Sequence, residues 1–273
     1  MNWGSIANLK KGRKPMRFDF NVCKQSDLED YLHHYAASLS SPIDSFLEER
    51  ILHSSFYEIS YNANKVGYFA VNSNYCLTQF YLDMFHYKHS QEIFKQIITE
   101  YSIKSILVPT CDEFLLSLVL DYDFKVEKQA YLFKDNKEHI ITDKLYQDGQ
   151  FQYAVLEDVK QIEMVCSEFI DRVEERIAKG EIFTFYKEDT LLGVGIAEQS
   201  KLLPGYVSIG MFTNAQYRQK GIGRTIIHHL KEWSYKNSLN PISGCWYYNT
   251  LSKLTLESAG MVTKTRLLNI KVV

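Results

Sequence analysis

An internal repeat constrains the fold of this chain more than any other feature of its sequence. Under an ungapped shift of 126 positions, Glu48-Glu49-Arg50-Ile51 coincides with Glu174-Glu175-Arg176-Ile177, and Gly67 coincides with Gly193. Self-similarity at a fixed period indicates that one folding unit occurs twice. The chain has 273 residues, which is long for a single domain. The repeat therefore predicts two packed units of the same fold.

The later part of each copy follows the repeat under a larger shift, of 137 positions. This larger shift brings Asp112 onto Asn249, and it brings Tyr131-Leu132-Phe133 onto Leu268-Asn269-Ile270. Because the second shift exceeds the first by 11, the second copy carries 11 additional residues. They lie between Glu198 and Asn249, and a segment found in only one of two copies is a candidate for function.

Hydrophobic periodicity predicts alternating strands and helices in both copies. In the first copy we expect strands at 17–22, 56–61, 66–71, 76–83, 105–109 and 125–133, and helices at 28–39, 43–53, 93–101 and 112–120. In the second copy we expect strands at 151–156, 182–187, 191–198, 206–213, 242–247 and 262–272, and helices at 159–169, 171–179, 223–236 and 250–259. The shared order of elements predicts the α/β fold class for both units.

A polar segment, Asp135–Gln150, is the natural linker between the two copies. We therefore predict three parts: a basic N-terminal tail at 1–15, a first unit at 16–140 and a second unit at 150–273. The basic residues of the tail precede no apolar run, so we expect no secretory signal there.

Composition narrows the class of protein. Hydrophobic residues make up 45% of the chain and aromatic residues 14%, which supplies a core and excludes a disordered chain. The 31 Lys and Arg against 33 Asp and Glu give a net charge of −2, without the basic excess of a dedicated nucleic-acid binder. No apolar stretch reaches the length of a membrane span, about 18 residues or more. We expect neither a nucleic-acid nor a membrane partner.

The cysteines indicate a reducing compartment. They are odd in number, widely spaced and never form a C-x-x-C pair, which is typical of buried thiols in a cytoplasmic protein. We therefore expect neither disulfides nor a metal site. The five are Cys23, Cys76, Cys111, Cys166 and Cys245.

The 11 additional residues fall in a region with a glycine-containing turn between a predicted strand and a predicted helix. The turn reads Arg218-Gln219-Lys220-Gly221-Ile222-Gly223-Arg224. Backbone N–H groups at the positive end of a helix dipole attract a phosphate. Side chains at Gly221 and Gly223 would block the approach of a phosphate, whereas Arg218 and Arg224 add charge-assisted hydrogen bonds. The turn therefore predicts a phosphate-binding site.

A purely structural turn is the alternative interpretation. The equivalent stretch of the first copy reads Phe85-His86-Tyr87-Lys88-His89-Ser90 and contains no glycine. Because a structural turn would not need to occur in only one of two similar copies, the comparison favours phosphate binding.

The same residues resemble the GNAT superfamily of acyl-CoA-dependent N-acyltransferases. The family signature R/Q-x-x-G-x-G/A, between a strand and a helix, is matched by residues 218–223. A second signature, an Asn, a small residue three positions on and a later Gly with an apolar residue, is matched by Asn249, Ser252, Gly260 and Met261. The resemblance covers 151–273 in full and the first copy only by its order of elements.

The resemblance implies the architecture and the cofactor. It implies two tandem GNAT-like units, each a mixed, mainly antiparallel twisted sheet flanked by helices, with the first unit a degenerate copy. It also implies acetyl-CoA, whose pyrophosphate the loop amides would hold and whose pantetheine arm would lie along a strand edge. The implied cofactor-binding residues are Met211, Phe212, Thr213, Arg218, Gln219, Lys220, Gly221, Ile222, Gly223, Arg224, Asn249 and Ser252.

The activity that the resemblance implies is acetyl transfer to a primary amine by direct attack on the thioester. The acceptor would be a small molecule or a peptide, a homodimer is left open, and a backbone N–H near Met211 would meet the developing oxyanion. Two alternatives remain. One is a non-catalytic acyl-CoA-binding regulatory module, and the other is an aminoacyl transferase of the tandem-GNAT cell-wall type, against which the phosphate loop argues.

The sequence departs from the family pattern at the general acid. Many members carry a Tyr seven residues after the motif Asn, where this chain has Leu256. Tyr247 and Tyr248, at the end of a predicted strand, are the remaining candidates for the acid, with packing as their other interpretation. Glu198 is the candidate general base, with a solvated strand-end carboxylate as its other interpretation.

Other reactive side chains carry less weight. His228 and His229 are adjacent on a predicted helix and point apart, which argues against a metal pair. Cys245 is more typical of a buried residue than of a nucleophile. The repeated Glu174-Glu175-Arg176 also occurs in the copy without the loop, so we interpret it as structural.

Overall fold

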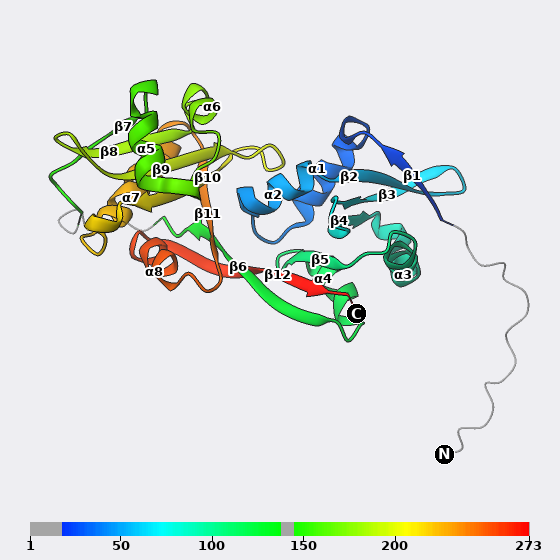
Figure 1. Cartoon of the computed structure of the whole chain (residues 1–273). Helices are drawn as coiled ribbons and strands as arrows, with labels where there is room; N and C mark the ends of the chain where they lie inside the picture. Colours follow the sequence, from blue (N-terminus) through cyan, green and yellow to red (C-terminus); the bar gives the residue numbers. More distant parts are fainter. Residues whose placement is uncertain (1–17, 138–144, 273) are drawn as a thin grey trace, which may run out of the picture.

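The computed structural model describes residues 18–137 and 145–272 (Figure 1). The predicted basic tail at 1–15 lies outside the described residues, as does part of the predicted linker. All the predicted strands and helices are present, with boundaries that differ by a few residues at most element ends.

The first copy forms six strands and four helices within the described part of the chain. The strands are β1 (Asp19–Cys23), β2 (Ser55–Tyr61), β3 (Asn64–Val71), β4 (Cys76–Leu82), β5 (Ser105–Pro109) and β6 (Lys125–Asp135). The helices are α1 (Glu29–Ser38), α2 (Ser45–Leu52), α3 (Ser90–Glu100) and α4 (Glu113–Leu120). A 3₁₀ segment, η2 (Met84–His89), takes the place of the glycine turn of the second copy.

The second copy repeats this order. Its strands are β7 (Gln150–Tyr153), β8 (Ile182–Lys187), β9 (Thr190–Gln199), β10 (Tyr206–Thr213), β11 (Asn240–Trp246) and β12 (Met261–Lys271). Its helices are α5 (Val159–Cys166), α6 (Val173–Ala178), α7 (Ile222–Lys236) and α8 (Thr250–Ser258). The predicted helix at 159–169 is shorter than expected, because the chain continues as a 3₁₀ turn, η5 (Ser167–Phe169).

The strands of both copies form one sheet of 12 strands. Their order is β1-β2-β3-β4-β5-β12-β6-β11-β10-β9-β8-β7. The pairs β4–β5 and β10–β11 are parallel, and every other neighbouring pair is antiparallel. The mixed, mainly antiparallel α/β class predicted from the sequence is confirmed.

The last strand of each copy completes the sheet of the other copy. β12 pairs with β5 of the first unit, and β6 pairs with β11 of the second unit. The two strands also pair with each other along the long ribbon that joins the two lobes in Figure 1. The sequence analysis predicted two sequential units, whereas their sheets are joined through this exchange.

Equivalent polar residues begin the helices that precede the exchanged strands. Asp112 Oδ1 accepts a hydrogen bond from the Leu115 N–H at 2.9 Å, and Asn249 Oδ1 accepts one from the Ser252 N–H at 3.1 Å. Asp and Asn at this position satisfy N–H groups that have no partner within the helix. The larger shift of the repeat therefore aligns two helix N-caps.

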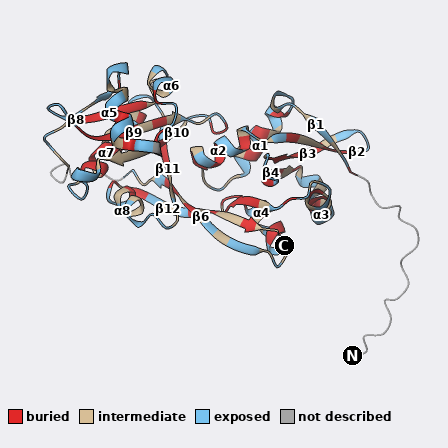
Figure 2. Cartoon of the chain, in the orientation of Figure 1, coloured by how far each residue is buried: buried red, intermediate tan, exposed pale blue. Residues whose placement is uncertain are grey.

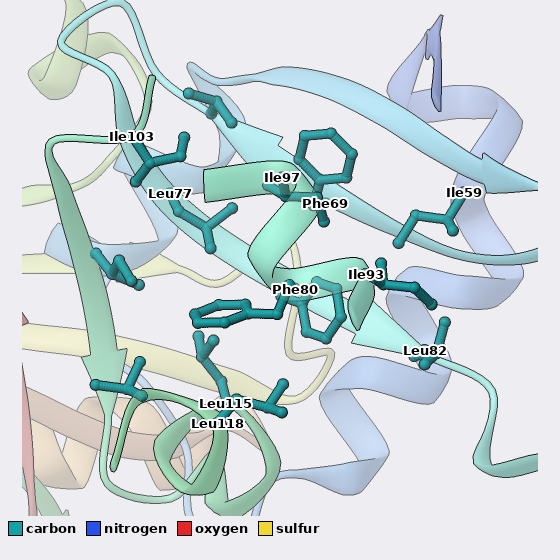
Figure 3. Close-up of a cluster of buried hydrophobic side chains, with 14 of the residues drawn as sticks. Ile59, Phe69, Leu77, Phe80, Leu82, Ile93, Ile97, Ile103, Leu115 and Leu118 are labelled. Atoms are coloured by element: carbon teal, nitrogen blue, oxygen red, sulfur yellow. The ribbon is translucent and has the colours of Figure 1, made fainter. Parts of the chain in front are cut away.

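Buried residues occur along the strands of both lobes (Figure 2). In the first unit, one cluster packs Phe69, Leu77 and Phe80 of the sheet against Ile93 and Ile97 of α3 (Figure 3). Corresponding clusters in the second unit lie beneath α7 and α8 on one face and beneath α5 and α6 on the other. Among the described helices, none is long and apolar enough to cross a membrane.

Helix α2 of the first unit is docked on the second unit. The buried carboxylate of Glu48 accepts hydrogen bonds from the Ser200 hydroxyl and from the Lys201 and Leu202 N–H groups. Leu202 and Leu203 of that loop belong to a hydrophobic cluster of the first unit. This contact brings α2 beside β10 and β11, where the candidate site is located.

Candidate active site

The candidate site begins where strands β10 and β11 separate. The parallel ladder joins only Tyr206 to Asn240, Val207 to Pro241 and Ser208 to Ile242. Beyond Ser208, β10 continues to Thr213 without pairing to β11. This fork leaves N–H and C=O groups of β10 available to an extended ligand.

The glycine turn brings the start of α7 to the same place. Gly221 precedes the helix with φ of 82°, a left-handed conformation that favours glycine. No side chain of the residues in 18–137 and 145–272 caps the helix, and its first turn contains no acidic residue. The first N–H groups of α7 are therefore available to an anion at the positive end of the helix dipole.

A cavity of about 510 Å³ occupies the space between this turn, the β10 edge and α8. Its lining includes every predicted cofactor-binding residue except Lys220. The predicted members that line it are Met211, Phe212, Thr213, Arg218, Gln219, Gly221, Ile222, Gly223, Arg224, Asn249 and Ser252. The Lys220 ammonium instead lies 5.1 Å from the centre of the Tyr217 ring.

Two arginines supply positive charge to the cavity. The Arg218 guanidinium lies over the Phe212 ring, and its Nε donates to the Thr213 carbonyl at 3.3 Å. Arg224 Nε is buried and has no hydrogen-bond partner among the described residues. Because an unpartnered buried donor is costly, this arrangement suits an anionic ligand.

The two motif glycines serve different purposes. A Cβ at Gly223 would lie 3.0 Å from Thr255 Cγ2 and 3.1 Å from Thr213 Oγ1, so glycine there lets α7 pack closely against α8 and β10. The sequence analysis assigned Gly223 to the approach of a phosphate, and the structure supplies this packing reason as well. At Gly221, the left-handed backbone is itself the requirement.

Four further residues line the cavity without having been predicted: Phe169, Leu251, Thr255 and Ser258. Leu251, Thr255 and Ser258 share one face of α8, so their spacing after Asn249 offered a signal. Phe169 comes from η5, and its ring lies 5.0 Å from that of Phe212. Nothing in the local sequence indicated that contact.

The predicted tyrosines do not line the cavity. The Tyr247 ring stacks on that of Tyr131 of β6, with centroids 4.6 Å apart. A hydrogen bond from Tyr131 lowers the pKa of Tyr247, and Lys128 acts in the same direction. Tyr248 is exposed beside Trp246. Their role as general acid stays a prediction.

The predicted general base, Glu198, is held in an ion pair. Its carboxylate contacts the half-buried Arg176 guanidinium, which also contacts Asp171 and Glu181. This network accords with the structural interpretation of Arg176. Glu198 also lies outside the cavity lining, so its role as base is likewise untested.

The remaining candidates occupy apolar surroundings. Leu256 is 2% exposed and belongs to the core beneath α7, so the position of the usual family Tyr faces the protein interior.

Burial raises the pKa of the Cys245 thiol to about 11, which disfavours a thiolate nucleophile. The His229 ring stacks on Phe151, and burial lowers its pKa. Within 18–137 and 145–272, no group of His, Cys, Asp and Glu has a metal-binding arrangement.

The first unit has a similar fork, but aromatic rings fill it. β4 and β5 pair in parallel only from Cys76 to Ser105 and from Leu77 to Ile106. Beyond them, the centre of the Phe80 ring lies 5.8 Å from that of the Phe114 ring and 5.9 Å from that of the Phe94 ring.

The ladders identify the residue of the second unit that corresponds to Phe80. Phe80 pairs with Phe69, and Met211 pairs with Gly195, which is the equivalent of Phe69 under the first shift of the repeat. Likewise, Phe114 corresponds to Leu251 under the larger shift. Smaller side chains at both positions therefore leave space in the second unit that two rings occupy in the first.

Comparison with protein families identifies the first unit. Residues 24–136 match the family described as acetyltransferase (GNAT) domain. The sequence analysis had related this unit to the superfamily only by its order of elements, so the match extends the relationship to its residues. A comparison with curated protein sequences found no match.

Solved structures resemble the chain over nearly its full length. A GNAT-family acetyltransferase from Colwellia psychrerythraea has a TM-score of 0.85 at 19% identity, covering 93% of this chain and 100% of that chain. A GCN5-related N-acetyltransferase from Sphaerobacter thermophilus has a TM-score of 0.68 at 12% identity, covering 94% and 96%. A tandem GNAT protein from the clavulanic acid biosynthesis pathway has a TM-score of 0.61 at 8% identity, covering 94% and 98%.

At these identities the structural likeness concerns the fold, and the family match concerns the first unit. A fold similar to that of a tandem GNAT protein agrees with the internal repeat. Residues 24–136 of the chain match the GNAT acetyltransferase domain family, and the whole chain has a fold similar to that of a tandem GNAT protein.

Proposed function

We propose that the second unit binds acetyl-CoA in the 510 Å³ cavity and transfers the acetyl group to a primary amine of a small molecule or a peptide. The observation that carries this proposal is the meeting of the uncapped start of α7 with the unpaired edge of β10. A ligand with a pyrophosphate at one end and an extended amide chain at the other fits both features.

The charges of the cavity suit this ligand. Arg218 and Arg224 lie on the side of the glycine turn, and within the part of the chain that the structure describes the buried Nε of Arg224 lacks a partner. Asn249 uses its Oδ1 to cap α8, which leaves its side-chain N–H groups for a carbonyl of the ligand. Bound acetyl-CoA supplies the thioester, an acyl group with a thiolate leaving group.

The protein would act mainly by holding the reacting groups. The edge of β10 fixes the extended arm, and a β10 N–H near Met211 would stabilise the oxyanion of the tetrahedral intermediate. The leaving thiolate has a pKa near that of cysteine, about 8.5, so it departs without strong acid assistance. Transfer of this kind needs no tyrosine in the cavity, and none is present among the described residues that line it.

A second function has one observation in its favour. Tyr247, Tyr248 and Glu198, the residues predicted to move protons, all lie outside the cavity lining. A regulatory module that binds acyl-CoA without transferring the acyl group would retain the loop and need no such residues.

Two measurements on the full chain distinguish these functions. Calorimetry with coenzyme A tests the cavity, and release of free thiol from acetyl-CoA in the presence of a panel of primary amines tests transfer. Binding together with amine-dependent thiol release supports the acetyltransferase. Binding without transfer to any amine favours the regulatory module, and absence of binding refutes both.

A further inference from the structure

The first unit places a carboxylate at the fork of the second unit. Asp44 is the N-cap of α2, and its Oδ1 accepts a hydrogen bond from the Leu47 N–H at 3.2 Å. The next residue, Ser45, donates its N–H to Ser208 Oγ at 3.3 Å. Because Ser208 is the last residue of β10 that pairs with β11, the start of α2 lies at the point where the strands separate.

The Asp44 carboxylate contacts β11 on the other side of the fork. A Cβ built on Gly244 would lie 1.8 Å from Asp44 Oδ2, so the carboxylate fills the place of the missing side chain. Any larger residue at 244 would displace it. Asp44 is 5% exposed, and glycine at 244 permits this close contact between the units.

Open space lies across the fork from this contact. Gly210 of β10 and Gly244 of β11 each stand two residues beyond the last pair, Ser208 with Ile242. Alternate residues of a strand share a face, so Gly210 lies on the face of Ser208, which α2 covers. A Cβ built on Gly210 would meet nothing within 4 Å. The fork therefore has room for a small group on the face of β10 that α2 covers. Asp44, Gly210 and Gly244 stand outside the lining of the 510 Å³ cavity, which on β10 begins at the next residue, Met211.

β10 itself offers no proton acceptor on this face. Its side chains there are those of Ser208, Gly210 and Phe212, none of which titrates near neutral pH. Glu198, opposite Ser208 on β9, is engaged by the Arg176 guanidinium. Asp44, in contrast, contacts no cation among the ion pairs of the described residues.

We propose that Asp44 of the first unit is the proton acceptor for the amine that reacts in the fork of the second unit. The inference rests on the proposed acetyl transfer and adds a residue that lies outside the glycine motif and in the other copy. It also gives the first unit a chemical role that its filled fork does not provide.

The proton balance of the step is simple. A primary ammonium gives one proton to the Asp44 carboxylate, and the neutral nitrogen attacks the thioester carbonyl to form the C–N bond. The C–S bond then breaks, its electron pair goes to sulfur, and the second nitrogen proton passes to the thiolate. Asp44 finally releases its proton to solvent, so one proton leaves for each amide formed.

The charged surroundings of Asp44 suit this role. Glu48 follows it on α2, Glu198 faces it from β9 with Arg176 behind, and Cys245 lies on β11. Burial raises the pKa of Asp44 to about 6, with smaller contributions from Glu198 and Glu48 in the same direction and hydrogen bonds from backbone N–H groups opposing them. A base with a pKa close to the working pH is ionised often enough to act and still basic enough to accept a proton.

The test is Asp44→Asn, which retains the shape of the side chain and its ability to cap α2. The matched control is Asp112→Asn, because Asp112 also caps a helix, is also 5% exposed and also has a pKa raised to about 6. Both variants are assayed with acetyl-CoA and the best amine of the panel, over a range of pH.

We expect Asp44→Asn to lower kcat/KM by about 10²- to 10⁴-fold while coenzyme A binds with unchanged affinity. The rise of kcat/KM through pH of about 6 should disappear in Asp44→Asn and persist in Asp112→Asn. Gly244→Ala, which displaces the Asp44 carboxylate, should also lower kcat.

Wild-type rate and pH profile in Asp44→Asn would overturn the inference while leaving the proposed function intact. An equal loss in Asp112→Asn would also overturn it, because the effect would then be structural. Failure of the wild-type protein to bind coenzyme A or to acetylate any amine would refute the proposed function, and this inference with it.

Discussion

Ala130 of β6 and Leu267 of β12 lie directly opposite each other in the central ladder of the sheet, and they are also equivalent residues under the larger shift of the repeat. When equivalent residues of two copies pair with each other, the copies are related by an approximate twofold rotation through that pair. The order of the sheet agrees, since it is the same when read from either edge with equivalent strands exchanged.

The exchanged strands predict that the second unit cannot fold alone. A fragment of residues 150–273 retains β12 but loses both of its neighbours, β5 and β6, and exposes the edge of β11. We expect this fragment to be insoluble or unfolded by circular dichroism. A full-length chain cut once between Lys137 and Leu145 is the control, and its two pieces should stay associated. A soluble, folded and active fragment would contradict this expectation.

Gly221 should affect coenzyme A binding through its place in the cavity lining as well as through its left-handed backbone conformation. Gly221→Val forces a branched side chain into a left-handed conformation at the cavity, and we expect binding to become undetectable by calorimetry. Gly205→Val is the matched control, because Gly205 has φ of 83°, compared with 82° at Gly221, and lies outside the cavity lining. Equal effects of the two variants on binding would show that strain alone is responsible.

A substitution at Glu48 should show how much the contact between the two units contributes to the free energy of unfolding. Its buried carboxylate accepts three hydrogen bonds from the loop at Ser200–Leu202, and Glu48→Gln removes the charge and one acceptor oxygen. We expect the free energy of unfolding in urea to fall by about 2 kcal/mol.

The neighbouring Glu49→Gln is the control for Glu48. Glu49 is half exposed and contacts only Arg172, at 3.6 Å, among the ion pairs of the described residues. The loss of this ion pair in Glu49→Gln should change the free energy of unfolding by less than about 1 kcal/mol. Similar losses in the two variants would argue against a special contribution from the buried carboxylate.

Asp112 should make stability depend on pH. Burial raises its pKa from 3.8 to about 6, so the folded protein favours the protonated form. Its favourable contribution is therefore complete below the unfolded pKa and is lost as the pH rises through about 6. Relative to wild type, Asp112→Asn should gain about 2–3 kcal/mol of unfolding free energy between pH of about 4 and about 8. Glu113→Gln, exposed in the same turn, should show no comparable gain in urea unfolding at the two pH values, and a flat difference for Asp112→Asn would contradict the prediction.

Local patterns predicted much of this molecule. The strands 105–109, 182–187 and 206–213 were placed with their observed boundaries, because alternation and short apolar runs depend on neighbouring residues alone. The glycine turn was recognised for the same reason. Its residues are contiguous, and all but Lys220 line one cavity. The prediction missed lining residues that come from other parts of the chain, such as Phe169.

The sequence by itself determined the repeat, the class and order of the elements, and the location of the glycine turn, since each can be recognised from the spacing of residues along the chain. Only the tertiary structure decided which sheet β6 and β12 join, because a strand has the same alternating pattern whichever neighbour it pairs with. It also decided the meeting of Asp44 with Gly244, which are far apart in the chain. That contact depends on docking α2 against another unit, and the local sequence of neither residue encodes the distance between them.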